Sequence, residues 1–152
     1  MVKCNINTGK LSNNIVEIRD VKKQNLVMDP LMFDENIINI KLTEDGKAIY
    51  VLLSSNRDGN QRVIKYNIGN TEPIFEYTLD PTPGSSYMNL HISRDGNHIS
   101  VTGSNTVVLT KYGKLAAPIY EGDTEGFSPC GNYLIHKIKG EKVDILKLKG
   151  YF

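Results

Sequence analysis

Three histidines are the first residues whose type and spacing could support chemistry. His91 and His98 flank the Arg94-Asp95-Gly96 turn, so a hairpin would bring their imidazoles close together, and His136 follows farther along the chain. A metal site needs three or four ligands and supporting contacts around them. No cluster of Cys, Asp or Glu residues supplies the remaining ligands. The sequence therefore predicts no metal and no cofactor, and the histidines are interpreted as strand or surface residues.

Cysteines and serines are the candidate nucleophiles. Cys4 and Cys130 lie far apart and neither belongs to a C-x-x-C pair, so we interpret them as buried, inert thiols. Ser85, Ser86 and Ser104 stand in Gly-containing loops. None of them lies in a G-x-S-x-G motif, which would need a strand–turn–helix context. The sequence predicts no catalytic residues and a protein that is not an enzyme.

Lysines gather near the end of the chain. Lys137, Lys139 and Lys142 precede two more, and on strands they would form one basic face able to contact RNA or an acidic protein. Few aromatic side chains stand among them for base stacking. A solvated outer face, with Lys protecting an edge strand from aggregation, is the favoured alternative.

Composition restricts the class of protein. The 152 residues suit one domain, predicted over 1–152, and a net charge of +1 gives no global attraction to nucleic acid or membrane. The polar N-terminus lacks the apolar core of a signal peptide, and no apolar run is long enough to span a bilayer. With two cysteines there is no disulfide framework. We expect a cytoplasmic protein without membrane association.

One hairpin pattern recurs along the chain and must position these residues. Alternating apolar residues lead into a turn with glycine, and a nearly continuous apolar strand follows. No segment has the apolar period of a helix, so the sequence predicts an all-β fold. The three copies are Ile37–Leu53 with Asp45-Gly46, Leu90–Val101 with Asp95-Gly96, and Phe127–His136 with Cys130-Gly131.

The repeat divides the chain into cycles of roughly 35 to 50 residues with four strands each, a period typical of propellers, solenoids or arrays. Asn25–Met28 is predicted as a short strand of the first cycle. The cycles give about three and a half blades, fewer than most closed propellers contain. They are a partial blade over 1–30, blades over 36–80 and 87–121, and a partial blade over 124–149.

The hairpins resemble blades of WD-repeat β-propellers. KLTEDGKAIYVL, HISRDGNHISV and FSPCGNYLI match the first two strands of a blade, and Arg19-Asp20 and Tyr66-Asn67 stand where that family has its Trp-Asp pair. Because Trp-Asp and Gly-His pairs are missing, the family's hydrogen-bond network is not carried over. The resemblance implies four-stranded antiparallel blades in an incomplete ring.

The resemblance also implies a function, a non-catalytic scaffold for protein–protein interaction. We expect the ring to be completed by a second chain, as a homodimer or within a larger complex. Two alternatives stay open: the propeller portion of a larger prolyl-oligopeptidase-like hydrolase, and an RNA- or ribosome-associated factor. The predicted partner-binding residues are Arg57, Asp58 and Asn60 in a middle loop, and Ser85, Ser86 and an exposed Tyr87 in the crossover loop. A plain connection is the alternative for the crossover loop.

Overall fold

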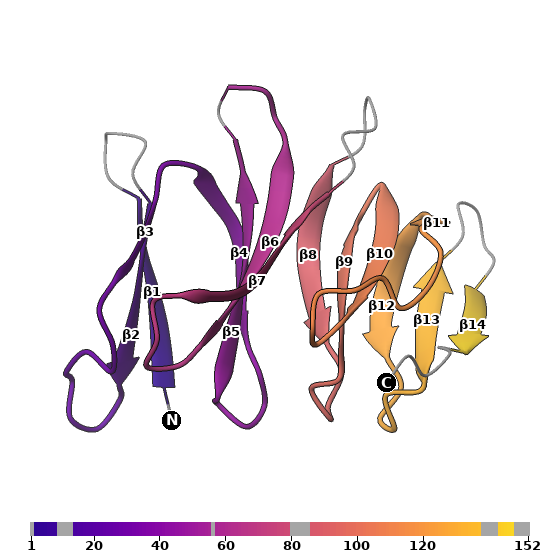
Figure 1. The fold of residues 1–152 in the computed structure, drawn as a ribbon. Helices are drawn as coiled ribbons and strands as arrows, with labels where there is room; N and C mark the ends of the chain where they lie inside the picture. The colour runs from indigo at the N-terminus through magenta and orange to yellow at the C-terminus, as the bar shows by residue number, and fades with distance from the viewer. Residues whose placement is uncertain (1, 9–13, 56, 80–85, 138–142, 148–152) are drawn as a thin grey trace. The chain divides into compact units, whose positions relative to one another are not determined.

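The computed structural model describes residues 2–8, 14–55, 57–79, 86–137 and 143–147 (Figure 1). Within these residues every regular element is a strand and none is a helix. The strands are β1 Val2–Thr8, β2 Asn14–Asp20, β3 Leu31–Phe33, β4 Asn36–Leu42, β5 Ala48–Ser54, β6 Gln61–Asn67, β7 Pro73–Thr78, β8 Tyr87–Ile92, β9 His98–Gly103, β10 Asn105–Thr110, β11 Tyr120–Glu121, β12 Asp123–Phe127, β13 Tyr133–Lys137 and β14 Val143–Lys147.

The strands form four antiparallel sheets, each built from consecutive segments of the chain. Their orders are β1-β2-β3, β4-β5-β6-β7, β8-β9-β10-β11 and β12-β13-β14. We call them the first to the fourth sheet. The predicted all-β fold of antiparallel, propeller-type blades is confirmed. The chain divides into two compact units, residues 1–80 and 81–152, each containing two sheets; the single domain over 1–152 stays a prediction.

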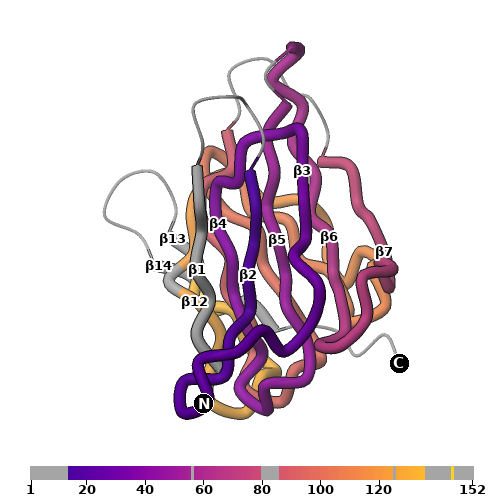
Figure 2. Tube along the Cα trace, turned by 90° about the vertical axis from the view of Figure 1, so that its left-hand side faces the viewer, coloured from indigo at the N-terminus to yellow at the C-terminus, as the bar shows by residue number. Residues whose placement is uncertain are grey.

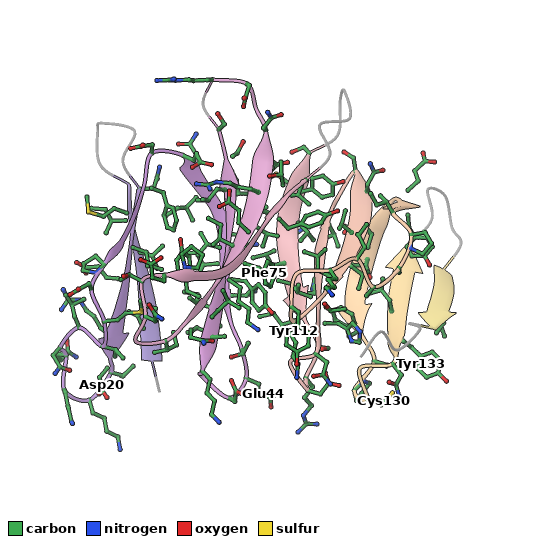
Figure 3. The ribbon with its side chains drawn as sticks, in the orientation of Figure 1. Asp20, Glu44, Phe75, Tyr112, Cys130 and Tyr133 are labelled. Carbon is green, nitrogen blue, oxygen red and sulfur yellow. The ribbon has the colours of Figure 1, made fainter. Side chains whose placement is uncertain are left out.

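The predicted hairpins are held by one repeated set of hydrogen bonds. In the second sheet the Thr43 hydroxyl donates to Asp45 Oδ1 at 2.6 Å, and the Ala48 N–H donates to Thr43 Oγ1 at 3.1 Å. Gly46 has φ +71°, a left-handed conformation that glycine adopts without strain. Glu44 lies at the tip of this turn (Figure 3). Side chain and backbone together fix the turn between the inner strand and its neighbour.

The predicted strand over Asn25–Met28 is wrong. Only Leu26 forms an isolated bridge there, with Arg19, and the third strand begins later, at Leu31. Asp20 explains the difference, because its Oδ1 accepts the N–H groups of two successive residues at 2.8 and 2.9 Å and so tightens the turn after β2. The chain regains a ladder only after Pro30, which has no N–H to donate.

The first unit is held together by an apolar layer between its two sheets. β5 is buried along nearly its whole length, as its continuous apolar sequence predicts. Alternate residues of β2 and β5 face each other across the layer, and Figure 2 shows the strands of the second sheet in the order β4, β5, β6, β7. The buried members of this layer are Val16, Ile18, Met28, Leu31, Phe33, Ile49, Val51, Leu53, Ile64 and Tyr66.

The second unit packs its two sheets through a smaller apolar cluster. Val108 of β10 contacts Leu134 of β13 and Ala116, with Phe127 packed at the edge. β12 contacts β8, β9 and β10, so the fourth sheet lies on one face of the third. Within the third sheet, a Cβ at Gly103 would stand 1.8 Å from the Ser86 carbonyl oxygen. Only glycine allows this close approach of two backbone segments.

Candidate interaction surface

The turn between β5 and β6 presents three of the predicted partner-binding residues. The Ser55 N–H donates to the Asn60 carbonyl at 2.8 Å, and the Gly59 N–H donates to the Ser55 carbonyl at 3.1 Å. Gly59 has φ +71°, which the tight reversal requires. Arg57, Asp58 and Asn60 are all exposed. Two backbone hydrogen bonds therefore close this turn, and its three predicted side chains lie in solvent.

The Asp58 carboxylate accepts a hydrogen bond from within the turn. Its Oδ1 accepts the Asn60 N–H at 3.0 Å. This bond, and then the Ser55 hydroxyl, lower the pKa of the Asp58 carboxyl below its usual value, so that it is an anion at neutral pH. The Arg57 N–H donates to Ser55 Oγ at 3.3 Å. The turn thus displays a cation and an anion next to each other.

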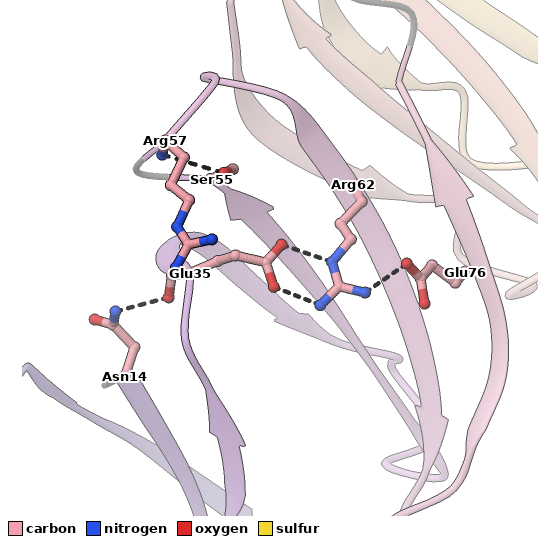
Figure 4. Close-up of polar contacts among 6 residues, drawn as sticks. All are labelled: Asn14, Glu35, Ser55, Arg57, Arg62 and Glu76. Carbon is pink, nitrogen blue, oxygen red and sulfur yellow. Dashed lines mark hydrogen bonds and ion pairs between the residues drawn. The ribbon is translucent and has the colours of Figure 1, made fainter. Parts of the chain in front are cut away.

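A second charged cluster lies in the same unit and connects its two sheets (Figure 4). Arg62 of β6 donates through Nε to Glu35 Oε2 at 2.6 Å and through Nη2 to Glu35 Oε1 at 2.5 Å, a bidentate pair. Its Nη1 donates to Glu76 of β7. Asn14 Nδ2 of the first sheet donates to the Glu35 carbonyl at 2.7 Å. Glu35 therefore joins the loop after β3 to both sheets.

The charges in this cluster stabilise one another. The hydrogen bonds that Arg62 donates to Glu35 are the largest influence on the pKa of Arg62, and together with those to Glu76 they raise it despite the opposing effect of burial. The side chains of Arg62 and Glu35 are 28% and 21% exposed, whereas Glu76 is 44% exposed. The cluster is a surface of fixed, alternating charge and carries one more carboxylate than guanidinium.

Sequence reasoning missed this cluster. In the β6–β7 register, Ile64 pairs with Glu76 and Arg62 pairs with Thr78, so Arg62 and Glu76 are diagonal neighbours on one face. That part could have been inferred from the predicted hairpin. Glu35 is 27 residues away in the chain, and no local pattern predicts its contact with Arg62.

The crossover segment differs from its prediction. Ser85 lies outside the described residues, and Ser86 is exposed. The expectation of an exposed aromatic at Tyr87 is wrong, because its side chain is only 2% exposed. Tyr87 is the first residue of β8 and pairs with Gly103, so it belongs to the sheet rather than to the loop. A ring placed on this inner strand gains more from burial than from exposure.

The predicted basic face falls mostly outside the described residues. Lys139 and Lys142 are not described, and Lys137 is the last residue of β13, paired with Val143. RNA binding therefore stays a prediction. Among the residues that the structure describes, no three His, Cys, Asp or Glu side chains converge as a metal site would require. No helix in these residues could cross a membrane.

Cys130 is exposed, so its interpretation as a buried thiol is wrong. It occupies the place of the aspartate in the third hairpin turn, between β12 and β13 (Figure 3). Its Sγ lies 3.3 Å from Ser128 Oγ, and the hydrogen bond with this hydroxyl is the main reason why the pKa of the thiol is lowered. This turn therefore has a thiol at the position where the first two hairpin turns have an aspartate carboxylate.

The fold has clear counterparts among solved structures. The C-terminal WD40 domain of Sif2 superposes with a TM-score of 0.65 at 13% identity, over 99% of this chain and 43% of that one. This is a β-propeller fold. Kuenenia stuttgartiensis hydrazine synthase superposes with a TM-score of 0.61 at 18% identity, over 91% of this chain and 47% of that one.

The likeness to β-propellers extends to structure and not to sequence. No family model matches the chain, and no curated protein sequence is similar to it. At these identities the propeller comparison establishes the fold alone. The chain spans less than half the length of either propeller-containing structure.

Proposed function

We propose that this chain is a non-catalytic scaffold for protein–protein interaction, and that a second copy of the chain completes its propeller. The observation that carries the proposal is the propeller fold, which the chain shares with the WD40 domain of Sif2 over 99% of its residues. Propellers commonly present loops at the ends of their strands to partners, and the β5–β6 turn offers an ordered, charged example. We also propose that the protein is located in the cytoplasm.

The outer faces of the first and fourth sheets support completion by a second copy. On the fourth sheet, Tyr133, Ile135 and Ile145 share the face opposite Leu134, and Ile145 is 70% exposed. On the first sheet, Ile15 pairs with Met32 on the face opposite the apolar layer, and Met32 is 67% exposed. Apolar side chains left in solvent on a sheet face favour association with another protein surface.

Light scattering over a range of concentrations tests the association. We expect twice the mass of the 17.0 kDa chain. Ile145→Lys should return the monomer, because burying the ammonium in an apolar interface is unfavourable. Tyr112→Lys is the matched control, since Tyr112 is 65% exposed but lies in the turn after β10. A monomer at every concentration, or a dimer that Ile145→Lys leaves intact, would contradict completion through these faces.

The scaffold role has a separate test in the β5–β6 turn. A photo-crosslinking residue at position 60 should form adducts in cell extract that are lost with Arg57→Glu. The same residue at position 22, exposed in the turn after β2, is the control. Identical adducts at both positions would remove the turn from the interaction surface.

A further inference from the structure

Three buried polar atoms without a protein partner lie on one strand of the second unit. They are His98 Nδ1, Ser100 Oγ and Thr102 Oγ1, and none has a hydrogen bond to any residue that the structure describes. Ser100 and Thr102 are 0% exposed and His98 is 6% exposed. Because they alternate along β9, all three side chains leave the same face of the third sheet. They form a polar column.

This polar column faces the fourth sheet. Ser100 pairs with Val108, so the two share a face, and Val108 packs against Leu134 of β13. The His98 ring stacks on Phe127, with centroids 6.3 Å apart. β12 contacts both β8 and β9. The unpartnered atoms are therefore enclosed between two sheets of the same unit.

β12, which packs against the sheet that carries the polar column, has an irregular ladder with β13. In the β12–β13 register, Thr124 pairs with His136 and Gly126 with Ile135, so residue 125 is an unpaired bulge. Gly126 adds space: among the described atoms, a Cβ at this position would have a single neighbour within 4 Å, His91 Nδ1 at 3.8 Å. A bulge next to a glycine takes backbone polar groups out of the regular ladder at a position that carries no side chain.

We propose that this layer is a hydration site, in which buried water molecules bind Ser100 and Thr102 and extend toward His98. Two hydroxyls and one imidazole nitrogen suit a small neutral ligand that both donates and accepts, and among the side chains that the structure describes no group of three His, Cys, Asp or Glu converges to hold a cation. Buried waters occupy such polar gaps and form two to four hydrogen bonds each. Without water in this layer, each unpaired polar group would lower the folding equilibrium constant by at least about fivefold.

Two neighbouring hydroxyls in the same layer form hydrogen bonds to backbone carbonyls. Thr106, which pairs with Thr102, donates to the Gly122 carbonyl at 2.7 Å. Thr124 of β12 donates to the Ile135 carbonyl at 2.5 Å. Protein atoms therefore already satisfy these two side chains. Among the described hydroxyls of this layer, those of the polar column are left for water, and Thr106 provides a matched control.

Magnetic relaxation dispersion of water oxygen detects buried water by its long residence in the protein. We expect a dispersion from the wild-type chain whose amplitude falls in Thr102→Val and in Ser100→Ala. In Thr106→Val the amplitude should stay unchanged, because that variant removes a bond to protein and not to water. Thr102→Val should also lower the folding equilibrium constant by about fivefold, since the water loses a partner.

Two results would overturn the hydration site. One is an equal dispersion amplitude in the wild type, Thr102→Val and Ser100→Ala. The other is a higher folding equilibrium constant for Thr102→Val, because removing an unpaired hydroxyl from a dry layer stabilises the fold. The valine is nearly the same shape as threonine, so the variant keeps the packing and the dispersion measurement does not depend on any change in stability.

Discussion

Two layers between neighbouring sheets, one in each unit, are built from the same repeated hairpin but held in different ways. The layer of the first unit is mainly apolar, with β2 and β5 contributing Ile, Val and Leu and with Asn14 buried on the same face of β2. Among the described residues, that of the second unit has Val108, Ala116 and Leu134 as its buried apolar members and places Ser100, Thr102 and Thr106 beside them. Each unit combines a three-stranded and a four-stranded antiparallel sheet, and the clearest contrast between the two layers lies in their side chains.

The contrast shows that neighbouring blades can pack through a mainly apolar layer or through a partly polar one. Apolar burial supplies roughly 1.5–3 kcal/mol for each fully buried Leu, Ile or Val side chain, without regard to direction. Buried hydroxyls contribute only when their hydrogen bonds are made, and a net bond is worth about 1 kcal/mol. The first unit should therefore be the more stable of the two. Its charged cluster adds orientation on the surface rather than much free energy.

Truncating one leucine in each layer is the strongest way to test this contrast. Leu53 and Leu134 are both 0% exposed. Leu53→Ala should lower the free energy of unfolding by about 4 kcal/mol, because it opens a cavity among tightly packed apolar neighbours. Leu134→Ala should lower it by about 2 kcal/mol, since fewer apolar contacts are lost and the polar layer accommodates water. Urea unfolding followed by circular dichroism measures both.

Native-state hydrogen exchange provides the control, because it reports the opening of each sheet separately. Amides of β13 should exchange by a lower-energy opening than amides of β5 in the wild type, and Leu134→Ala should widen that gap. Equal losses for the two leucine variants would end the distinction between the layers. A larger loss for Leu134→Ala would reverse it.

The sequence predicted the strands well where a turn and a pattern agreed. The three hairpins with glycine turns were found because the turn chemistry and the apolar strand after it point the same way. Asn25–Met28 failed because a short apolar run cannot reveal that Asp20 redirects the chain beforehand. The resemblance to propellers was predicted from the repeated hairpin, and each copy of this hairpin can be recognised in a short stretch of sequence.

The sites were less predictable, since they depend on contacts between sheets. Alternation in His98–Thr102 is typical of a strand with one face in water, yet both faces are buried because β12 covers the polar one. Tyr87 begins the predicted blade over 87–121, but an exposed side chain was inferred for it from the loop before the strand, and the ring is buried. Glu35 reaches Arg62 across 27 residues. Each error arose because the sequence does not show which surfaces are covered by another part of the chain.

Removing Arg62 tests how much polar contacts add to the apolar layer of the first unit. Arg62→Met should lower the free energy of unfolding by about 1 kcal/mol, a value reduced by the solvent that reaches all three side chains. Glu76→Gln should have a smaller effect, because Glu76 is the most exposed of the three. Thermal unfolding at low salt measures both, and the loss should shrink in about 1 M NaCl. A loss comparable to that of Leu53→Ala would mean that charge, not burial, dominates this unit.

The smallest expected effect concerns the turns of the second unit, where Asp95 and Cys130 hold equivalent positions. Burial acts to raise the pKa of Asp95, but hydrogen bonds from Asn97 and Ser93 outweigh it and lower the pKa below the usual value. Its contribution to stability is therefore present above about pH 4 and is lost as the pH falls through the lowered folded-state value. Acid unfolding of Asp95→Asn should lack this dependence.

Asp95 also explains why a thiol suits position 130. A Cβ at Gly131 would lie 3.0 Å from Asp95 Oδ2, so a carboxylate next to it would face a like charge. Cys130→Asp should therefore destabilise the wild type but stabilise the Asp95→Asn variant, where it completes the turn with Ser128 without repulsion. A double-mutant cycle of thermal unfolding measures this change of sign. If Cys130→Asp has the same effect in both backgrounds, the two turns are independent, and the fourth sheet is tied to the third by its hydrated layer and apolar cluster alone.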